Sequence, residues 1–141
     1  MARIRIDIPE HFPFITTIPV RITDLNYGKH VGNDTILSMI HEARVQYLAH
    51  FGYEELNLGG PGLIMSDVGI EFKNELFYGD VVTASVAAGD FSKIAFDLYY
   101  KLEKPGKLVA IAKTGMVCYD YAKKKVAAIP EEVMRKLKSE V

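Results

Sequence analysis

The feature that most constrains the fold is a strand-like segment that leads through a polar loop directly into a helix-like segment. Residues 14–22 are rich in the β-branched and aromatic side chains that favour strands. After the loop, apolar residues recur at intervals of three and four, the period of a helix that buries one face. These positions are Ile36, Ile40, Ala43, Tyr47 and Phe51, with Leu37 and Leu48 widening the stripe.

The predicted helix has signals at both of its ends. Gly32 or Asn33 is placed to act as the N-cap, and Asp34 adds negative charge to the first turn. Gly52 follows Phe51, at a position where glycine commonly ends a helix. A helix of this length extends about 27 Å at ~1.5 Å per residue, which is enough to lie across a whole sheet.

The rest of the chain predicts strands joined by turns. After a strong break at residues 59–62, the strand-like segments are residues 63–72, 81–88, 91–102 and 108–121. Turn signals lie between them, at residues 74–80, 89–90 and 104–107. Four successive strands joined in this way predict antiparallel pairing, and Pro130 is placed to begin a short C-terminal helix. We therefore expect one α+β domain over residues 1–141, with the long helix packed against one sheet face.

Composition restricts the class of protein. A formal net charge of −1 over 141 residues argues against non-specific nucleic-acid binding. No apolar run approaches the roughly 20 residues of a membrane span, and residues 1–10 lack a signal-peptide core. Cys118 is the single cysteine, which leaves no internal disulfide or cysteine-rich zinc site. Together with the missing apolar segments, this makes a cytoplasmic protein the expectation. His11, His30, His41 and His50 lack ligand spacing beside carboxylates, so we predict no metal.

The loop between strand and helix concentrates polar side chains. It contains Asp24, Asn26, His30, Asn33 and Asp34. These residues precede a helix N-terminus, where backbone N–H groups without helical partners and the helix dipole favour an anion or a developing oxyanion. The loop is therefore the candidate functional site.

This loop resembles that of the hotdog-fold acyl-CoA thioesterases, in their 4-hydroxybenzoyl-CoA thioesterase-like branch. There a loop of the form D-x-D-x-x-G-H-V-N-N precedes a helix with a Glu and an Ala-Arg pair. The matching residues are Asp24, Asn26, His30, Val31 and Asn33, then Glu42, Ala43 and Arg44, with Phe72, Tyr78, Gly79, Asp80, Phe91, Ser92 and Lys93 further along. The resemblance covers about residues 16–130 and implies a hotdog fold, with a long helix packed against a curled, five-stranded antiparallel sheet.

Two positions depart from the family's loop. The family's second Asp, its usual nucleophile or base, falls at Asn26, whose amide does not ionise. The glycine before the histidine falls at Lys29. Another carboxylate must then act as the base. We favour Asp34, where the helix dipole favours a carboxylate, over Asp24, which matches the family's more often structural first Asp.

The resemblance implies hydrolysis of acyl-CoA to a free acid and CoA, with no cofactor other than the CoA of the substrate. The Asn33 N–H would polarise the thioester carbonyl, and Asp34 or Asp24 would activate water. Asn26 and His30 would position the thioester. Simpler roles stay open, because Asn33 and Asp34 can act only as helix caps and His30 can only tie down the loop.

Substrate binding and assembly also follow from the resemblance. Lys93, beside Ser92, is the first candidate for a contact with the CoA phosphates, and Lys73 is the second. Tyr27 is a candidate for the acyl pocket. Because the family's active site lies between protomers, we predict a homodimer or homotetramer in which residues 63–72 cross near the partner's loop.

Two other functions remain as alternatives. The chain could be a non-catalytic protein that binds acyl-CoA or an acyl carrier, which Asn26 favours because it cannot be a base. A hotdog dehydratase is less favoured, because His30 and Glu42 do not have the spacing of that branch. Ligand retention without turnover, or hydration of an enoyl thioester, would distinguish these two from a hydrolase.

Overall fold

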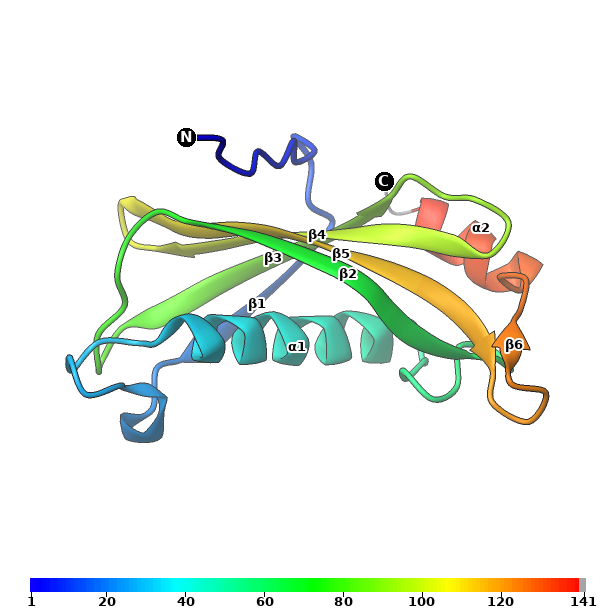
Figure 1. Ribbon diagram of the computed structural model, residues 1–141, viewed down its shortest axis with the longest axis horizontal. Coiled ribbons are helices and arrows are strands. Elements are labelled where there is room, and N and C mark those ends of the chain that lie inside the picture. Colours follow the sequence, from blue (N-terminus) through cyan, green and yellow to red (C-terminus); the bar gives the residue numbers. More distant parts are fainter. Residues whose placement is uncertain (140–141) are drawn as a thin grey trace.

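The computed structural model describes residues 1–139. Its elements are β1 (Phe14–Pro19), the 3-10 helix η1 (Ile22–Asp24), α1 (Asn33–His50), β2 (Gly62–Phe72), β3 (Val81–Gly89), β4 (Ala95–Lys104), β5 (Lys107–Asp120), β6 (Lys125–Val126) and α2 (Glu131–Ser139). All strand pairs are antiparallel and belong to one twisted sheet, with α1 lying along one face (Figure 1). The predicted α+β class and long helix are confirmed. The sheet has five long strands, and the two-residue β6 is added at β5.

The strand order, β1-β3-β4-β5-β2, differs from the predicted succession of hairpins. Strands β3, β4 and β5 do form hairpins, and the turn predicted at residues 104–107 joins Lys104 to its partner Lys107. Strand β2 pairs with β5, however, because β3 is already flanked by β1 and β4. Residues 73–80 are therefore a crossover between distant parts of the sheet, whereas the sequence predicted a turn between neighbouring strands at residues 74–80. We call this segment the crossover.

Two predicted strand ends were wrong. The first strand ends at Pro19 rather than at residue 22, because Ile22–Asp24 form η1 and the Asp24 carboxylate accepts the Arg21 N–H at 2.7 Å. The strand predicted from residue 91 begins at Ala95. Here the Ser92 hydroxyl accepts the Ala95 N–H at 3.1 Å, and this turn replaces the start of the strand.

The ends of α1 follow the prediction. The helix begins at Asn33 with Gly32 as its N-cap and ends at His50. Gly52 has a φ of 84°, the left-handed conformation in which glycine ends helices without strain.

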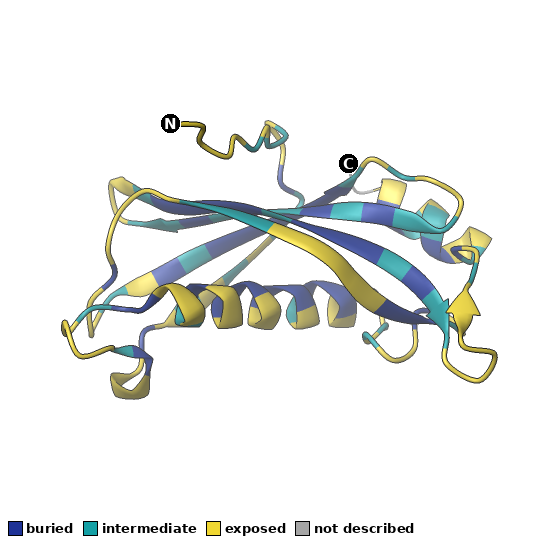
Figure 2. Ribbon diagram, in the orientation of Figure 1, coloured by how far each residue is buried: buried dark blue, intermediate teal, exposed yellow. Residues whose placement is uncertain are grey.

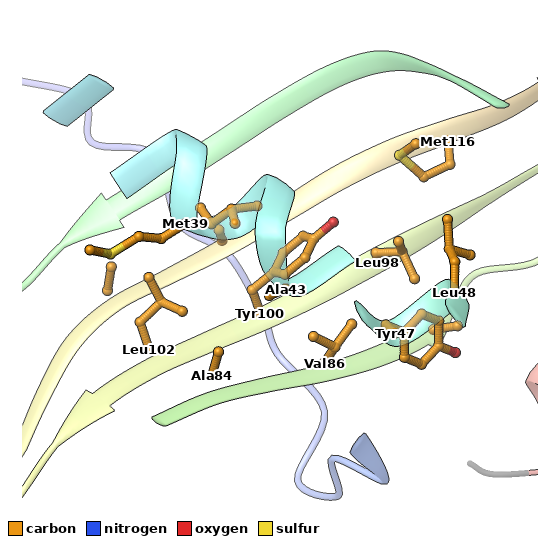
Figure 3. Close-up of a cluster of buried hydrophobic side chains, with 14 of the residues drawn as sticks. Met39, Ala43, Tyr47, Leu48, Ala84, Val86, Leu98, Tyr100, Leu102 and Met116 are labelled. Carbon is orange, nitrogen blue, oxygen red and sulfur yellow. The ribbon is translucent and has the colours of Figure 1, made fainter. Parts of the chain in front are cut away.

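The hydrophobic core lies between α1 and the inner face of the sheet (Figure 3). Helix α1 contributes Ile36, Met39, Ile40, Ala43, Tyr47 and Leu48, and β4 contributes the alternate residues Phe96, Leu98, Tyr100 and Leu102. Burial of each large side chain contributes about 1.5–3 kcal/mol. This packing holds α1 firmly, and so fixes its N-terminus relative to the sheet.

One long edge of the sheet is open. Strand β2 is an edge strand, and much of it is exposed beside the outward face of α1 (Figure 2). Its exposed side chains include Met65, Val68 and Phe72, and α1 adds Leu37 and Val45. No helix within residues 1–139 is both long and apolar enough to cross a membrane.

Candidate active site

The loop before α1 is closed by its own hydrogen bonds. The Asn26 N–H donates to the His30 carbonyl at 2.9 Å, and the Lys29 N–H donates to the Asn26 carbonyl at 3.0 Å. The Asn26 side-chain oxygen accepts the Gly28 N–H at 2.8 Å, which is an Asx turn. Lys29 takes a left-handed φ of 63°, where the resembling family has glycine. The Asn26 side chain therefore shapes the loop.

The start of α1 presents backbone donors. The Gly32 carbonyl accepts the N–H groups of Thr35 and Ile36, both at 3.1 Å. Among the described residues, the amides of Asn33 and Asp34 have no hydrogen-bond acceptor. They are the first two N–H groups of the helix and have no helical partner. Two adjacent donors are thus available to an oxyanion.

A cavity of about 290 Å³ opens beside these donors. It is lined by His30, Val31, Asn33 and Ile36 on one side and by residues 72–76 on the other. We call it the crossover cavity. It brings together three of the predicted site residues: His30, Asn33 and Lys73. The loop and the crossover lie at the same end of the molecule (Figure 1), and the Val31 N–H joins them by donating to the Leu76 carbonyl at 2.9 Å.

Glu75 is the residue of this cavity that the sequence analysis missed. One of its carboxylate oxygens, Oε1, lies 3.9 Å from Nε2 of His30. The other ring nitrogen, Nδ1, is 3.2 Å from the Val31 carbonyl. Glu75 reaches the site only because β2 pairs with β5, so no local pattern in the sequence marks it.

The crossover is held firmly around Glu75. Lys104 Nζ donates to the Glu75 carbonyl at 2.8 Å, and the Asn74 side chain donates to the Leu108 carbonyl at 2.7 Å. The next residue, Leu76, is 1% exposed. Asp80 ends the crossover, and hydrogen bonds from the Phe77 N–H and then from Lys104 lower the pKa of its carboxyl. The backbone of Glu75 is therefore fixed while its side chain faces solvent.

The two carboxylates predicted as bases lie in different surroundings. Asp24 lines a second cavity of about 300 Å³ between β1 and α1, which we call the β1 cavity. It is buried, and accepts the Arg21 N–H at 2.7 Å and its guanidinium at 3.3 Å. Asp34 is exposed in the first turn of α1, and a Cβ on Gly32 would lie 2.7 Å from its Oδ1. Neither carboxylate lines the crossover cavity.

The other predicted binding residues are not brought to this cavity within one chain. Tyr27 is fully exposed at the tip of the loop. Ser92 and Lys93 lie in the turn between β3 and β4, at the end of the molecule that carries α2 (Figure 1). The Lys93 carbonyl accepts the Ile129 N–H at 2.9 Å just before α2.

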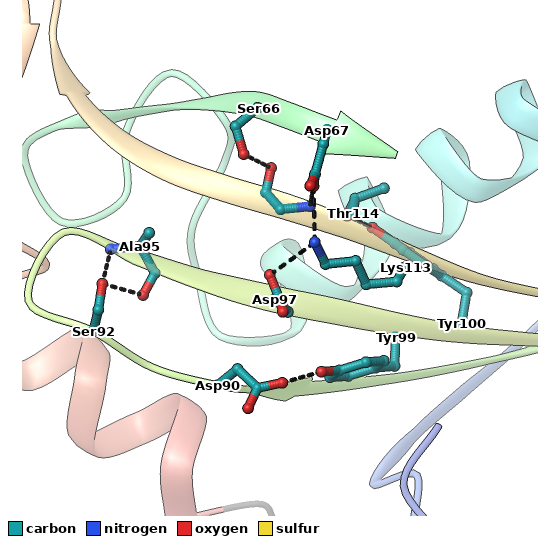
Figure 4. A network of polar contacts seen from close by, with 11 residues as sticks. Ser66, Asp67, Asp90, Ser92, Ala95, Asp97, Tyr99, Tyr100, Lys113 and Thr114 are labelled. Carbon is teal, nitrogen blue, oxygen red and sulfur yellow. Dashed lines mark hydrogen bonds and ion pairs between the residues drawn. The ribbon is translucent and has the colours of Figure 1, made fainter. Parts of the chain in front are cut away.

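A polar cluster on the outer face of the sheet is separate from the candidate site. Lys113 Nζ lies 2.9 Å from Asp67 and 3.5 Å from Asp97 (Figure 4). The hydrogen bond from Lys113 lowers the pKa of Asp67, whereas burial raises the pKa of Asp97. Lys113 pairs with Tyr99 across β4 and β5, on the face opposite Tyr100 and the core.

A family model described as the thioesterase-like superfamily matches residues 20–137. The chain belongs to this superfamily. No curated protein sequence matches it significantly. This match confirms the family that the sequence of the loop resembles.

Solved structures share the fold of this thioesterase-like protein. A thioesterase from Thermus thermophilus, complexed with coenzyme A and zinc, is 20% identical, has a TM-score of 0.82, and aligns over 94% of this chain and 96% of its own. A 1,4-dihydroxy-2-naphthoyl-CoA thioesterase from Synechocystis is 22% identical, with a TM-score of 0.81 and coverage of 91% and 96%. A hypothetical protein from Aquifex aeolicus is 25% identical, with a TM-score of 0.81 and coverage of 89% and 99%. These matches confirm the predicted hotdog fold.

The chemistry available in this thioesterase-like chain comes from three kinds of group. The helix start supplies N–H donors, His30 supplies an imidazole, and Glu75 supplies a carboxylate. Within residues 1–139 there is no group of three or more His, Cys, Asp or Glu arranged to hold a metal ion. The arrangement suits attack by water on a carbonyl whose oxygen becomes negatively charged.

Proposed function

We propose that this protein hydrolyses acyl-CoA thioesters to a free acid and coenzyme A. The observation that carries the proposal is that Asn33, whose N–H has no acceptor among the described residues, lines the cavity that also holds His30. The superfamily match supports thioester chemistry. The fold shared with a thioesterase solved in complex with coenzyme A supports a ligand of this type.

In this proposal, the thioester carbonyl oxygen is placed against the Asn33 and Asp34 N–H groups. The helix fixes both donors before the substrate binds, so they stabilise the oxyanion as it forms without reorganising. Removal of one such donor typically lowers the rate about 10²–10³-fold. Water supplies the attacking oxygen, and a group of this site takes its proton. Asp34 is the base that the sequence favoured.

Asp24 is the weaker candidate for the base. Its carboxylate is buried against Arg21 in the β1 cavity, and so its lone pairs are already engaged by two donors. Asn26 contributes by shaping the loop through its bond to the Gly28 N–H. These contacts favour structural roles for both residues.

We also propose a homodimer formed through the β2 edges. An open edge strand with exposed Met65, Val68 and Phe72 needs cover, and two-fold pairing of edge strands provides it. Antiparallel pairing of two β2 strands would place the loop end of one protomer near the opposite end of its partner. That arrangement would allow Ser92 and Lys93 to serve the partner's crossover cavity, while Lys73 serves its own.

Asn26 favours a second function, that of a non-catalytic protein that binds acyl-CoA or an acyl carrier. Its amide occupies the position at which the resembling family has its usual base, and an amide cannot accept a proton from water at neutral pH. The same cavity and helix N-terminus would then hold the thioester without cleaving it.

The experiment that tests the proposal measures thiol release from short, long and aromatic acyl-CoAs, together with calorimetric binding of coenzyme A. Turnover well above the uncatalysed rate supports the hydrolase. Binding without turnover would support the non-catalytic alternative and contradict the proposal. An enoyl-CoA in the same panel, followed for hydration, tests for a dehydratase.

A further inference from the structure

Glu75 and His30 face each other across the crossover cavity in a geometry suited to holding one water molecule. Their nearest atoms, Oε1 and Nε2, are 3.9 Å apart, too far for a direct hydrogen bond. A water at normal hydrogen-bond distance, about 2.8 Å, from both atoms fits this separation. The Glu75 and His30 side chains are 63% and 34% exposed, so water can reach them.

The contact made by Nδ1 determines which nitrogen of His30 carries the proton. Nδ1 lies 3.2 Å from the Val31 carbonyl, which can only accept, so the neutral ring donates through Nδ1. Nε2 then carries a lone pair and faces Glu75. A water between two acceptors donates one proton to each, which leaves its own lone pairs free to attack.

We propose that His30 and Glu75 together activate the attacking water, in place of the carboxylate that the resembling family carries where this chain has Asn26. This inference rests on the proposed hydrolase function. Water oxygen forms a bond to the thioester carbon while its proton moves to His30 Nε2, and Glu75 stabilises the imidazolium that results. The carbonyl electrons move to the oxygen held by the Asn33 and Asp34 N–H groups.

The second half of the reaction returns that proton. The oxyanion re-forms the carbonyl and the C–S bond breaks, with its electron pair leaving on sulfur. The imidazolium of His30 donates its proton to the thiolate, which departs as the free thiol, and the acid product loses its own proton to solvent. His30 and Glu75 are restored, and no other reactant is consumed.

The other charged groups near the pair are less suited to this task. Lys73 lines the same cavity, but it is a cation and lies 3.2 Å from the Glu71 carboxylate. Asp34 is exposed, and its carboxylate turns toward Gly32 rather than lining the cavity. Glu75 is the carboxylate that lines the cavity and also faces His30.

The test compares kcat and KM for wild type, Glu75→Gln, Asp34→Asn and the double variant Glu75→Gln/His30→Asn, on the best acyl-CoA of the panel. Glu10→Gln, which replaces an exposed glutamate of the N-terminal segment, is the matched control. Loss of general-base catalysis typically lowers the rate about 10²–10⁴-fold, and Glu75→Gln removes the carboxylate that holds the water and stabilises the His30 imidazolium. We expect a loss of this size in kcat for Glu75→Gln, with KM changed less than about threefold.

The double variant should lose little more kcat than Glu75→Gln alone, because the effects of residues that act as a unit do not add. Glu10→Gln should keep kcat within a few-fold of wild type, and Asp34→Asn, which removes the exposed carboxylate but keeps the backbone N–H, should lose less kcat than Glu75→Gln. Full kcat in Glu75→Gln would overturn the inference while leaving the hydrolase intact, and loss confined to Asp34→Asn would do the same. Absence of turnover by wild type would overturn the proposed function, and this inference with it.

Discussion

Two cavities of nearly equal volume flank the start of α1, about 300 Å³ on the β1 side and about 290 Å³ on the crossover side. In the β1 cavity, the Asp24 carboxylate is 8% exposed and is bonded to Arg21. In the crossover cavity, His30 and Glu75 are 34% and 63% exposed and make no direct hydrogen bond to each other. The carboxylate of the β1 cavity is thus already hydrogen-bonded within the protein, whereas His30 and Glu75 of the crossover cavity remain available to a substrate.

The same contrast holds for backbone groups. On the β1 side, the Arg21 N–H is engaged by Asp24 at 2.7 Å. On the crossover side, the Asn33 N–H has no acceptor among the described residues. We therefore expect substitutions in the β1 cavity to change stability and those in the crossover cavity to change catalysis.

Among the substitutions that test this contrast, Asn33→Pro is expected to have the largest effect, because it removes the Asn33 N–H beside the crossover cavity. Proline is tolerated as the first helical residue, and Gly32 before it is already extended, with φ −75° and ψ 160°. We expect kcat to fall about 10²–10³-fold without loss of helix in circular dichroism. Asn33→Ala, which keeps the N–H, is the control. Equal activity of the two variants would remove Asn33 from the oxyanion site.

Asp24→Ala tests the β1 cavity, where we expect a substitution to lower stability and not activity. It removes two hydrogen bonds to a buried carboxylate, so we expect a loss of about 1–3 kcal/mol in the free energy of unfolding, measured with denaturant. The kcat of the folded protein should stay near the wild-type value. A large loss of kcat with unchanged stability would instead make Asp24 the base.

A smaller effect is expected from Lys73→Met, which removes a cation from the crossover cavity. An exposed ion pair with a CoA phosphate contributes up to about 1 kcal/mol, or roughly a fivefold increase in KM when it is lost. The difference from wild type should shrink at high salt, because salt screens exposed charges. Lys107→Met, in the exposed β4–β5 turn, should leave KM unchanged. If KM does not rise in Lys73→Met, Lys73 does not contact the CoA phosphates.

The smallest effect concerns the anchoring of the crossover by Asp80. The pKa of Asp80 is lowered in the folded protein, so its contribution to stability is present above the ordinary value of 3.8 and is lost as pH falls through the folded pKa. Asp80→Asn should therefore unfold slightly more easily than wild type at neutral pH, and the two melting temperatures should converge at acidic pH. A constant difference across that range would show that the charge has no part in the anchor.

The sequence predicted the parts of the fold that depend on local signals. Gly32 and Gly52 mark the ends of α1, and the turn at residues 104–107 sets the β4–β5 hairpin. The place of β2 could not be predicted in this way. It depends on β1 occupying one side of β3, and their pairing partners, such as Thr16 and Ala84, are far apart in the chain.

The residues of the candidate site also differ in whether local sequence or long-range strand pairing places them. His30 and Asn33 were predicted because they stand beside a helix start, which is a local feature. Glu75 was missed because only the long-range pairing of β2 with β5 brings the crossover to the loop. Ser92 and Lys93 came from a family resemblance that places the active site between protomers, so their distance from the crossover cavity within one chain does not test them.

The place where the thioester binds can be measured directly. A non-hydrolysable acyl-CoA thioether can be titrated into the isotope-labelled protein while backbone amide shifts are followed by NMR. The largest shifts are expected at His30, Asn33 and Glu75 around the crossover cavity. Shifts concentrated instead at Thr17, Ser38 and Glu42, which line the β1 cavity, would contradict this expectation.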